Sequence, residues 1–176
     1  MSPSTIGRPQ ANEHADFYLQ YVSKVPDGDL LSLLREQSAD TVRLLQDLTP
    51  DQANYAYAPG KWTIKEVVGH IGDAERIFAY RALRIARNDP TPLSSFDENT
   101  YVANANFGAR ALSDLLDELQ VVRASTIHLA KSWDAETLAR VGTASGKPVS
   151  VRALLYIIAG HERHHAALFR ERYLSR

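Results

Sequence analysis

Apolar residues recur at helical spacing over four long segments of this 176-residue chain, and this periodicity most constrains its fold. The most regular series consists of Leu112, Leu115, Leu116, Leu119, Val122, Leu129 and Trp133. Side chains three and four positions apart lie on the same face of a helix, so the series forms one apolar stripe. Four such helices with little strand pattern predict an all-α fold, a four-helix bundle.

The ends of the other three long helices also carry signals. The first predicted helix follows the segment VPDGD and ends at Pro50, with one apolar face made by Leu30, Leu34, Val42, Leu45 and Leu48. The second begins at Thr63, which forms a T-x-x-E capping box with Glu66, and ends before the two prolines of residues 88–92. The fourth opens at Ser150, a favourable N-cap residue.

The remaining segments are shorter or less regular. We expect an extra short N-terminal helix within residues 13–22, a long loop over residues 91–108 between the second and third helices, and a small turn or hairpin over residues 142–150. Residues 1–12 show no apolar pattern and are expected to form a poorly ordered tail. Residues 1–176 together are of a length that predicts a single domain.

Composition excludes several functional classes. The net charge is −1, and lysine and arginine are spread along the chain, so no basic surface predicts nucleic-acid binding. No apolar run reaches the length of a membrane span, and the N-terminal residues lack the apolar region of a signal peptide. The absence of cysteine excludes disulfides, thiolate ligands and a cysteine nucleophile. A cytoplasmic location is expected by default.

The segment GHERHH, residues 160–165, holds three of the six histidines and an H-E-x-x-H motif. On the fourth helix, His161 and His165 fall within roughly 20° of the centre of the inward face, whereas His164 lies about 80° away. Two neutral imidazoles buried side by side lack partners in an apolar interior, and a metal ion would satisfy both. Their alternative role is that of core histidines bonded to the backbone or to water.

A third ligand would favour a metal site further. His70 is the candidate: it lies on the second helix, about 80° from the centre of its apolar face. Taken by itself it is typical of a histidine on the flank of a helix, and only a neighbouring pair of inward histidines favours a ligand. His14 and His128 are expected to be solvated.

A zinc protease is the first function that H-E-x-x-H indicates, with Glu162 as its base. Such an enzyme needs a third ligand downstream, yet only 11 residues follow His165, and Glu171 is their only carboxylate. Glu171 lies six positions after His165 and points away from the histidine pair. The sequence also lacks the metzincin continuation of the motif. The protease is therefore a minor alternative.

The segments APGKWTIKEVVGHIGDAERIF (58–78), FDENTYV (96–102) and SVRALLYIIAGHERHH (150–165) are similar to motifs of the DinB/YfiT-like superfamily. The resemblance covers nearly the whole chain. It implies a four-helix bundle that holds a divalent metal ion with three histidines, which map to His70, His161 and His165. It also implies a homodimer.

The same resemblance implies one of two activities on a small-molecule substrate. Some members are described as metal-dependent hydrolases, and others transfer low-molecular-weight thiols such as bacillithiol or mycothiol to electrophiles. The mycothiol-dependent isomerase branch has a carboxylate among its ligands, which this sequence does not show. A metal-binding bundle without catalysis, with a stress-response or interaction role, is the alternative.

Three imidazoles leave a divalent ion with at least one open position, as in catalytic rather than structural sites. That position accepts a water molecule or a cofactor thiol, and the ligand set suits Zn, Ni, Fe or Cu. Glu162 is a candidate catalytic base; a solvated glutamate balanced by Arg163 is the other interpretation. Asp73, one turn after His70, either orients that imidazole or forms a surface ion pair.

Overall fold

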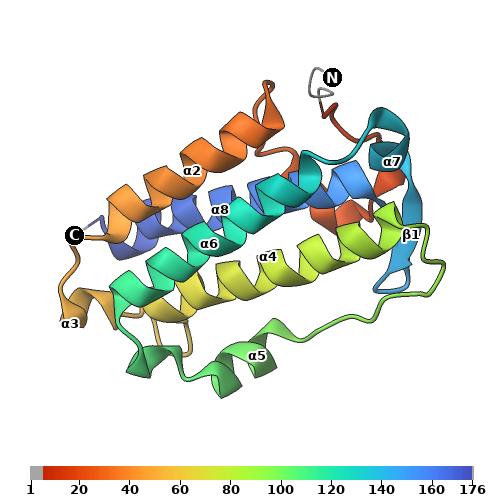
Figure 1. Cartoon of the computed structure of the whole chain (residues 1–176). Helices are drawn as coiled ribbons and strands as arrows, with labels where there is room; N and C mark the ends of the chain where they lie inside the picture. The colour runs from red at the N-terminus through yellow and green to blue at the C-terminus, as the bar shows by residue number, and fades with distance from the viewer. Residues whose placement is uncertain (1–5, 176) are drawn as a thin grey trace.

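The computed structural model describes residues 6–175, and its four long helices confirm the predicted bundle (Figure 1). These helices are α2 (Leu30–Leu45), α4 (Ile64–Ala86), α6 (Leu112–Ala130) and α8 (Val151–Leu168). Their starts follow from local chemistry. At α4, the Glu66 amide donates to Thr63 Oγ1 at 3.2 Å and the Thr63 amide donates to Glu66 Oε2 at 2.7 Å. At α8, Ser150 Oγ accepts from the Ala153 amide at 3.0 Å.

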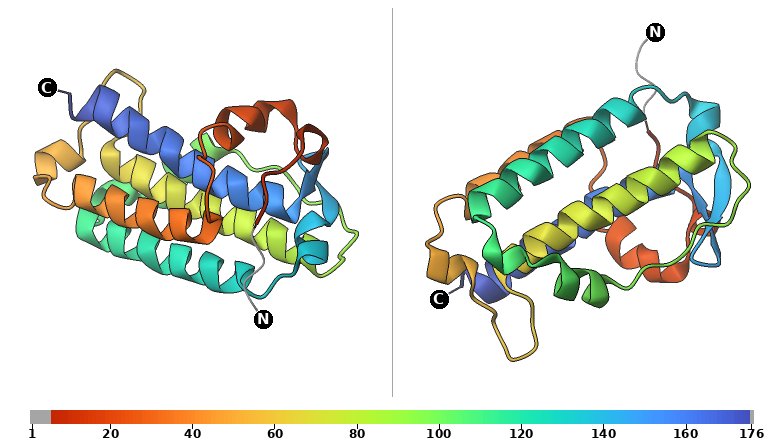
Figure 2. Two further views of the ribbon diagram at one scale, coloured as in Figure 1. Left: turned by 90° about the horizontal axis from the view of Figure 1, so that it is seen from above. Right: turned by 60° about the horizontal axis from the view of Figure 1, so that its bottom comes forward.

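The four helices contact one another in the order α2, α6, α4 and α8 around the bundle, so α2 and α4 are diagonal neighbours. Figures 1 and 2 show that α4 and α6 run in the same direction, opposite to α2 and α8. A chain that joins two parallel helices must return along the whole bundle. Residues 87–111 make this return, which explains why the connection is so long.

The prediction of a long loop in this connection is wrong in part. Residues 91–108 include α5 (Glu98–Ala105) and the first part of a 3-10 turn, Phe107–Ala109. Asp97 caps α5 by accepting from the amides of Asn99 and Thr100. Only Val102 of the eight α5 residues is buried. A helix that buries one side chain leaves no apolar stripe, and its periodicity could not be seen.

Short elements surround the four long helices. The predicted N-terminal helix is broken into 3-10 turns at Ala11–Glu13 and Asp16–Tyr18 and the single turn α1 (Leu19–Val22). The other short helices are α3 (Pro50–Ala53) and α7 (Ala135–Ala139), and a π-helical turn, Phe169–Tyr173, extends α8.

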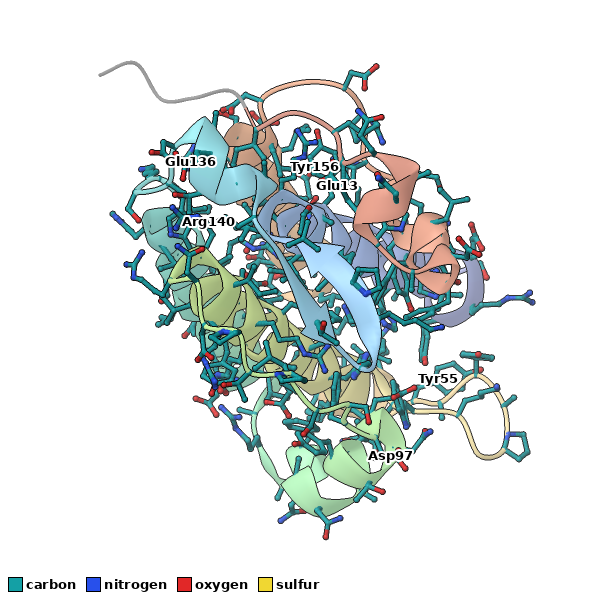
Figure 3. All side chains as sticks on the ribbon, turned by 90° about the vertical axis from the view of Figure 1, so that its right-hand side faces the viewer. Glu13, Tyr55, Asp97, Glu136, Arg140 and Tyr156 are labelled. Atoms are coloured by element: carbon teal, nitrogen blue, oxygen red, sulfur yellow. The ribbon has the colours of Figure 1, made fainter. Side chains whose placement is uncertain are left out.

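The predicted hairpin is present as β1 (Val141–Ala144) and β2 (Lys147–Ser150), paired antiparallel from Val141↔Ser150 to Ala144↔Lys147. Its two-residue turn places Ser145 at φ 53° and Gly146 at φ 71°, as the tight hairpin turns require. Figure 3 shows the hairpin lying across one end of the bundle. Leu93 pairs with its edge, because the Leu93 amide donates to Thr143 and the Ser145 amide to Leu93.

The segment before α2 packs on α8. Of the tail predicted over residues 1–12, residues 1–5 lie outside the described chain; the rest is not a tail, since Ile6 is 3% exposed and Arg8 donates to the Val22 and Val25 carbonyls. The backbones approach closely at Gly160 of α8. A Cβ atom there would lie 2.0 Å from the Tyr21 carbonyl oxygen, so glycine is required.

The apolar core is divided into two clusters along the bundle, one around Phe78, Leu154 and Ile158, the other around Ile71, Leu119 and Phe169. Where one gives way to the other, the helices bury polar side chains: Gln37, Thr41, His70, Glu75, Arg123, His161, Glu162 and His165. Within the described residues, no helix is both long and apolar enough to cross a membrane.

Candidate metal centre

Three histidines meet in this polar layer, between α4 and α8. His70 Nε2 lies 3.0 Å from His161 Nε2, and His165 Nε2 lies 3.2 Å from the same atom. One ring nitrogen from each of the three lies within 4.8 Å of the others, the single such group that could hold a metal ion among residues 6–175. The structure thus brings together the three histidines that the sequence analysis singled out as ligands.

Burial keeps these imidazoles neutral. His70, His161 and His165 are 7%, 6% and 8% exposed. Desolvation lowers the pKa of His70 to about 4. It also holds the pKa values of His161 and His165 well below the ordinary value, and the neighbouring histidines add to the effect. At neutral pH each ring therefore presents a lone pair.

The residues fit a divalent ion. His161 Nε2 faces two other imidazole nitrogens, and a neutral ring nitrogen is either one donor or one acceptor, so it cannot satisfy both. Two nitrogens bound to one tetrahedral zinc ion at ~2.0–2.1 Å lie about 3.3 Å apart, near the spacing found here. In addition, His165 Nδ1 is buried without a hydrogen-bond partner among the described residues. The cluster is unsatisfied by protein atoms alone.

The other histidines stay outside this cluster. His164 is half-buried, with its ring centroid 5.6 Å from that of Tyr21. His128 is exposed, as expected. The expectation that His14 is solvated is wrong: it is 7% exposed, and its Nδ1 lies 3.0 Å from the Ala15 carbonyl oxygen.

Glu162 points away from the histidines and into a second buried cluster. Its carboxylate accepts from Thr41 Oγ1 at 2.7 Å and from Gln37 Nε2, and it pairs with Arg123 at 2.8 Å. Arg123 also forms a two-pronged pair with Glu75, at 2.9 and 2.8 Å. These five side chains come from all four long helices.

These contacts change the interpretation of Glu162. It is 1% exposed and paired with Arg123, so the solvated glutamate balanced by Arg163 is wrong. The same contacts hold the Glu162 carboxylate on the side of α8 away from the histidines. Glu162 therefore cannot act as a base at the histidine site. Asp73 pairs with Arg76 at 3.3 Å. Of its two expected roles, the structure shows the surface ion pair.

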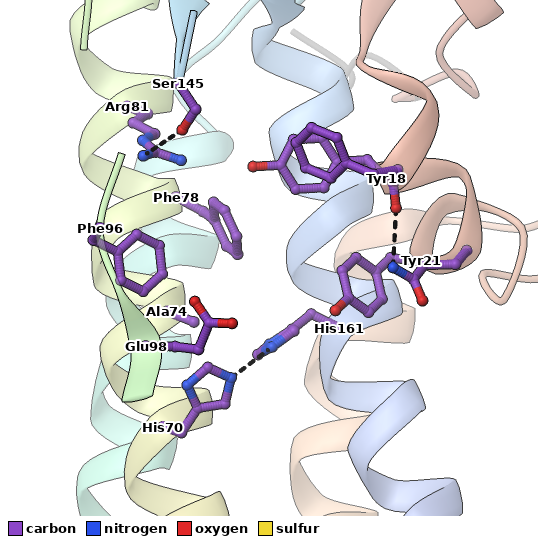
Figure 4. Close-up of a pocket in the computed structure, with 12 residues that line it drawn as sticks. Tyr18, Tyr21, His70, Ala74, Phe78, Arg81, Phe96, Glu98, Ser145 and His161 are labelled. Carbon is purple, nitrogen blue, oxygen red and sulfur yellow. Dashed lines mark hydrogen bonds between the residues drawn. The ribbon is translucent and has the colours of Figure 1, made fainter. Parts of the chain in front are cut away.

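A pocket of about 330 Å³ opens onto the histidines (Figure 4). It runs along α4 between the N-terminal segment and the connection that carries α5. Its lining residues are Phe17, Tyr18, Gln20, Tyr21, His70, Ala74, Phe78, Arg81, Phe96, Glu98, Ser145 and His161. Two candidate ligands thus form part of its wall, and aromatic rings form much of the rest.

Glu98 is the carboxylate that the sequence analysis missed. It is the first residue of α5, it is exposed, and Figure 4 shows its carboxylate directed into the pocket beside His70 and His161. Burial raises the pKa of Tyr21 across the pocket, and the negative charge of Glu98 adds to this effect. The motif FDENTYV contained this residue, but nothing in the sequence indicated that the connection folds back over His70.

Comparisons with known proteins bear on the family and the fold. The sequence profile of the DinB superfamily matches residues 33–169. A curated protein of Oceanobacillus iheyensis, named "Putative metal-dependent hydrolase", is 25% identical over 155 residues, covering 85% of this chain and 88% of that protein.

Two solved structures share the fold. YfiT from Bacillus subtilis, described as a probable metal-dependent hydrolase with an unusual four-helix bundle topology, has a TM-score of 0.74, with 19% identity and 94% of each chain covered. The mycothiol-dependent maleylpyruvate isomerase has a TM-score of 0.66 and 15% identity, over 83% of this chain and 61% of that one. At these identities the likeness concerns the fold alone.

Proposed function

The chain belongs to the DinB superfamily, and from this premise we propose that it is a metal-dependent enzyme that hydrolyses a small molecule. The proposal rests on the convergence of His70, His161 and His165, two of which, His70 and His161, line an open pocket. Three buried neutral imidazoles would hold a divalent ion and leave it an open position, as catalytic sites do.

A bound ion would supply Lewis acidity and lower the pKa of water, which is the chemistry that hydrolysis at neutral pH needs. The protein's own groups would do the rest. Among residues 6–175, Glu98 is the one carboxylate that lines the pocket. In this role it accepts a proton from the attacking water and returns it to the leaving group when the ester or amide bond breaks.

The aromatic side chains around the pocket would hold the substrate. Phe78 packs edge-on against Tyr18, with centroids 6.1 Å apart, and against Phe96, with centroids 6.5 Å apart. Phe78 is also 6.1 Å from the His161 ring. A flat or apolar group bound among these rings therefore lies next to the histidines, and the pocket volume limits the substrate to a small molecule.

Thiol transfer is the second candidate. The chain contains no cysteine, so any thiol that reacts at the site must arrive with a ligand. The fold is shared with a protein named as mycothiol-dependent. In this reaction the histidine site would bind a low-molecular-weight thiol as its thiolate, and the pocket would hold the electrophile.

A parallel assay separates the candidates. Purified protein loaded with Zn, Ni or Fe is offered nitrophenyl esters and anilides, and separately bacillithiol or mycothiol with a model electrophile. We expect metal-dependent ester or amide turnover that falls at least tenfold in Glu98→Gln, while the metal content stays the same. Glu36→Gln, on the exposed side of α2, is the matched control.

The outcomes are distinct. Turnover only with a thiol present favours the transferase. If neither class of substrate shows metal-dependent turnover, the non-catalytic metal-binding role replaces the enzyme. If hydrolysis is unchanged in Glu98→Gln, the protein is a hydrolase in which Glu98 is not the base.

A further inference from the structure

The far end of the same pocket holds a buried cation. Arg81 of α4 is 2% exposed and lines the pocket, as His70 does 11 positions earlier on the same helix. Arg123 is the other buried arginine of the described chain, and it pairs with two carboxylates. Among the described residues Arg81 forms no ion pair with an acidic side chain.

Neutral groups hold the Arg81 guanidinium in place. Its Nη2 donates to the Ser94 carbonyl at 2.6 Å and to Ser145 Oγ at 3.2 Å. Its central carbon lies 5.8 Å from the ring centroids of both Phe78 and Phe96. These contacts tie the connection to the hairpin and fix the side chain, but none of them neutralises its charge.

A buried cation without a counter-ion is costly, and the pocket is the side from which an anion can reach it. The guanidinium is planar and its N–H groups match the two oxygens of a carboxylate. Figure 4 shows Arg81 and Ser145 at one end of the pocket and His70 and Glu98 at the other, with Phe78 and Phe96 between them.

We propose that Arg81 binds the carboxylate of an aromatic monocarboxylate substrate, whose neutral reacting group extends to the histidines. The second half of this proposal rests on the proposed function. The guanidinium carbon is 5.8 Å from the Phe78 centroid, which is 6.1 Å from the His161 centroid, so the two ends are at most about 12 Å apart. One small molecule can span that distance.

Among the side chains that line the pocket, one can pair with an anionic group. Arg81 is this partner at one end, whereas the acidic Glu98 lies beside the histidines at the other. The rings of Tyr18, Phe78 and Phe96 surround the middle, where an aromatic ring packs edge-to-face. A monocarboxylate with an aromatic ring and an uncharged ester, amide or electrophilic carbon fits all three parts.

The first test needs no variant and no metal. Metal-free full-length protein, kept in EDTA at constant ionic strength, is titrated with benzoate and with its neutral isostere benzamide, and binding is followed by NMR. Without an ion, the carboxylate has Arg81 as its partner. We expect benzoate to bind at least tenfold more tightly than benzamide, with ring-proton NOEs to Phe78 and Phe96. Equal affinities, or benzoate NOEs elsewhere, overturn the proposal.

Variants assign the preference to Arg81. Arg81→Gln should lower benzoate affinity at least tenfold, to the level of benzamide. The matched control is Arg84→Gln, on the next turn of α4, where the arginine pairs with Asp89 outside the pocket. A tenfold loss in the control, or none in Arg81→Gln, overturns the proposal, and the wild-type comparison decides it if Arg81→Gln does not fold.

The result is independent of catalysis. Benzoate selectivity without any metal-dependent turnover would support the anion site at Arg81 and contradict the proposed enzyme. Turnover without benzoate selectivity would support the proposed enzyme and contradict the anion site.

Discussion

Two buried polar clusters lie on opposite sides of α8 and begin at consecutive residues, His161 and Glu162. The first turns toward α4, where three imidazole nitrogens face one another and leave lone pairs unused. The second turns toward α2 and α6, where Arg123, Gln37 and Thr41 occupy the Glu162 carboxylate. Both clusters are almost completely buried, yet only one is complete without a ligand.

The difference shows how to distinguish a structural polar cluster from a binding site. Burial alone does not do so, because both clusters interrupt the apolar core at the same level. What differs is the balance of donors and acceptors: one arginine and two carboxylates neutralise most of each other's charge, whereas three neutral imidazoles have no mutual arrangement that satisfies all of them.

Loss of one imidazole should abolish metal binding. We expect His70→Ala, His161→Ala and His165→Ala to lower the bound metal from about one ion per chain to near zero after gel filtration, because two ligands cannot hold the ion firmly. His164→Ala, one position from a ligand, should keep its metal. Elemental analysis gives the measurement. An empty site in His164→Ala together with a full one in His70→Ala would show that the ligand set is wrong.

Disruption of the second cluster should instead affect the fold. Arg123→Met leaves Glu75 and Glu162 as buried, unpaired carboxylates, which costs about 3–5 kcal/mol. Urea unfolding of the metal-free protein at neutral pH measures the free energy of unfolding. Arg84→Met, at a half-buried surface ion pair with Asp89, should change it by less than ~1 kcal/mol. A similar loss in the two variants would mean that the Arg123 cluster adds nothing special to stability.

The histidine cluster should make the metal-free fold sensitive to acid. Because burial lowers the pKa of His70 to about 4, the unfolded chain binds more protons than the folded one between pH 4 and pH 6.5. Stability is therefore complete above about pH 6.5 and falls as the pH drops toward 4, by up to roughly 1.4 kcal/mol per pH unit for this one group.

His161 and His165 act in the same direction, since their pKa values are also lowered by burial. Urea unfolding in EDTA at several pH values gives the slope directly. His70→Gln should make the slope shallower, because the amide does not titrate in this range. A slope that His70→Gln leaves unaltered would refute the assignment of acid sensitivity to this cluster.

The smallest effect is expected at Thr41. Thr41→Val removes one hydrogen bond to the Glu162 carboxylate without a change in shape, and should cost about 1–3 kcal/mol. Metal content should remain at one ion per chain, as elemental analysis can verify. Metal loss in this variant would show that the two sides of α8 are coupled rather than independent.

Local chemistry accounts for what the sequence could predict. The Thr63–Glu66 capping box and the Ser150 cap lie where the helices begin, because a cap depends only on residues within one turn. The inward direction of His161 and His165 follows from the helical repeat in the same way. His70 was a weaker inference, since its role depends on which helix lies opposite.

The rest depended on tertiary topology. Glu98 and Arg81 line the pocket because the connection over residues 87–111 returns along α4, and no periodicity in that segment indicates the return. The pairing of Arg123 with Glu75 and Glu162 joins α6 to α4 and α8, which pack in an order that the sequence does not reveal. The residues next to Glu162 in sequence therefore do not predict its partners, which lie far along the chain.

The close contact at Gly160 has a consequence for variation at this position. Any side chain there collides with the Tyr21 carbonyl, so the segment that carries Tyr18 and Tyr21 would have to move away from α8. The next residue, His161, would keep its place on the helix. Tyr18 and Tyr21 line the pocket beside His70 and His161, so a single methyl group at residue 160 would displace one wall of the pocket from α8 and change its shape.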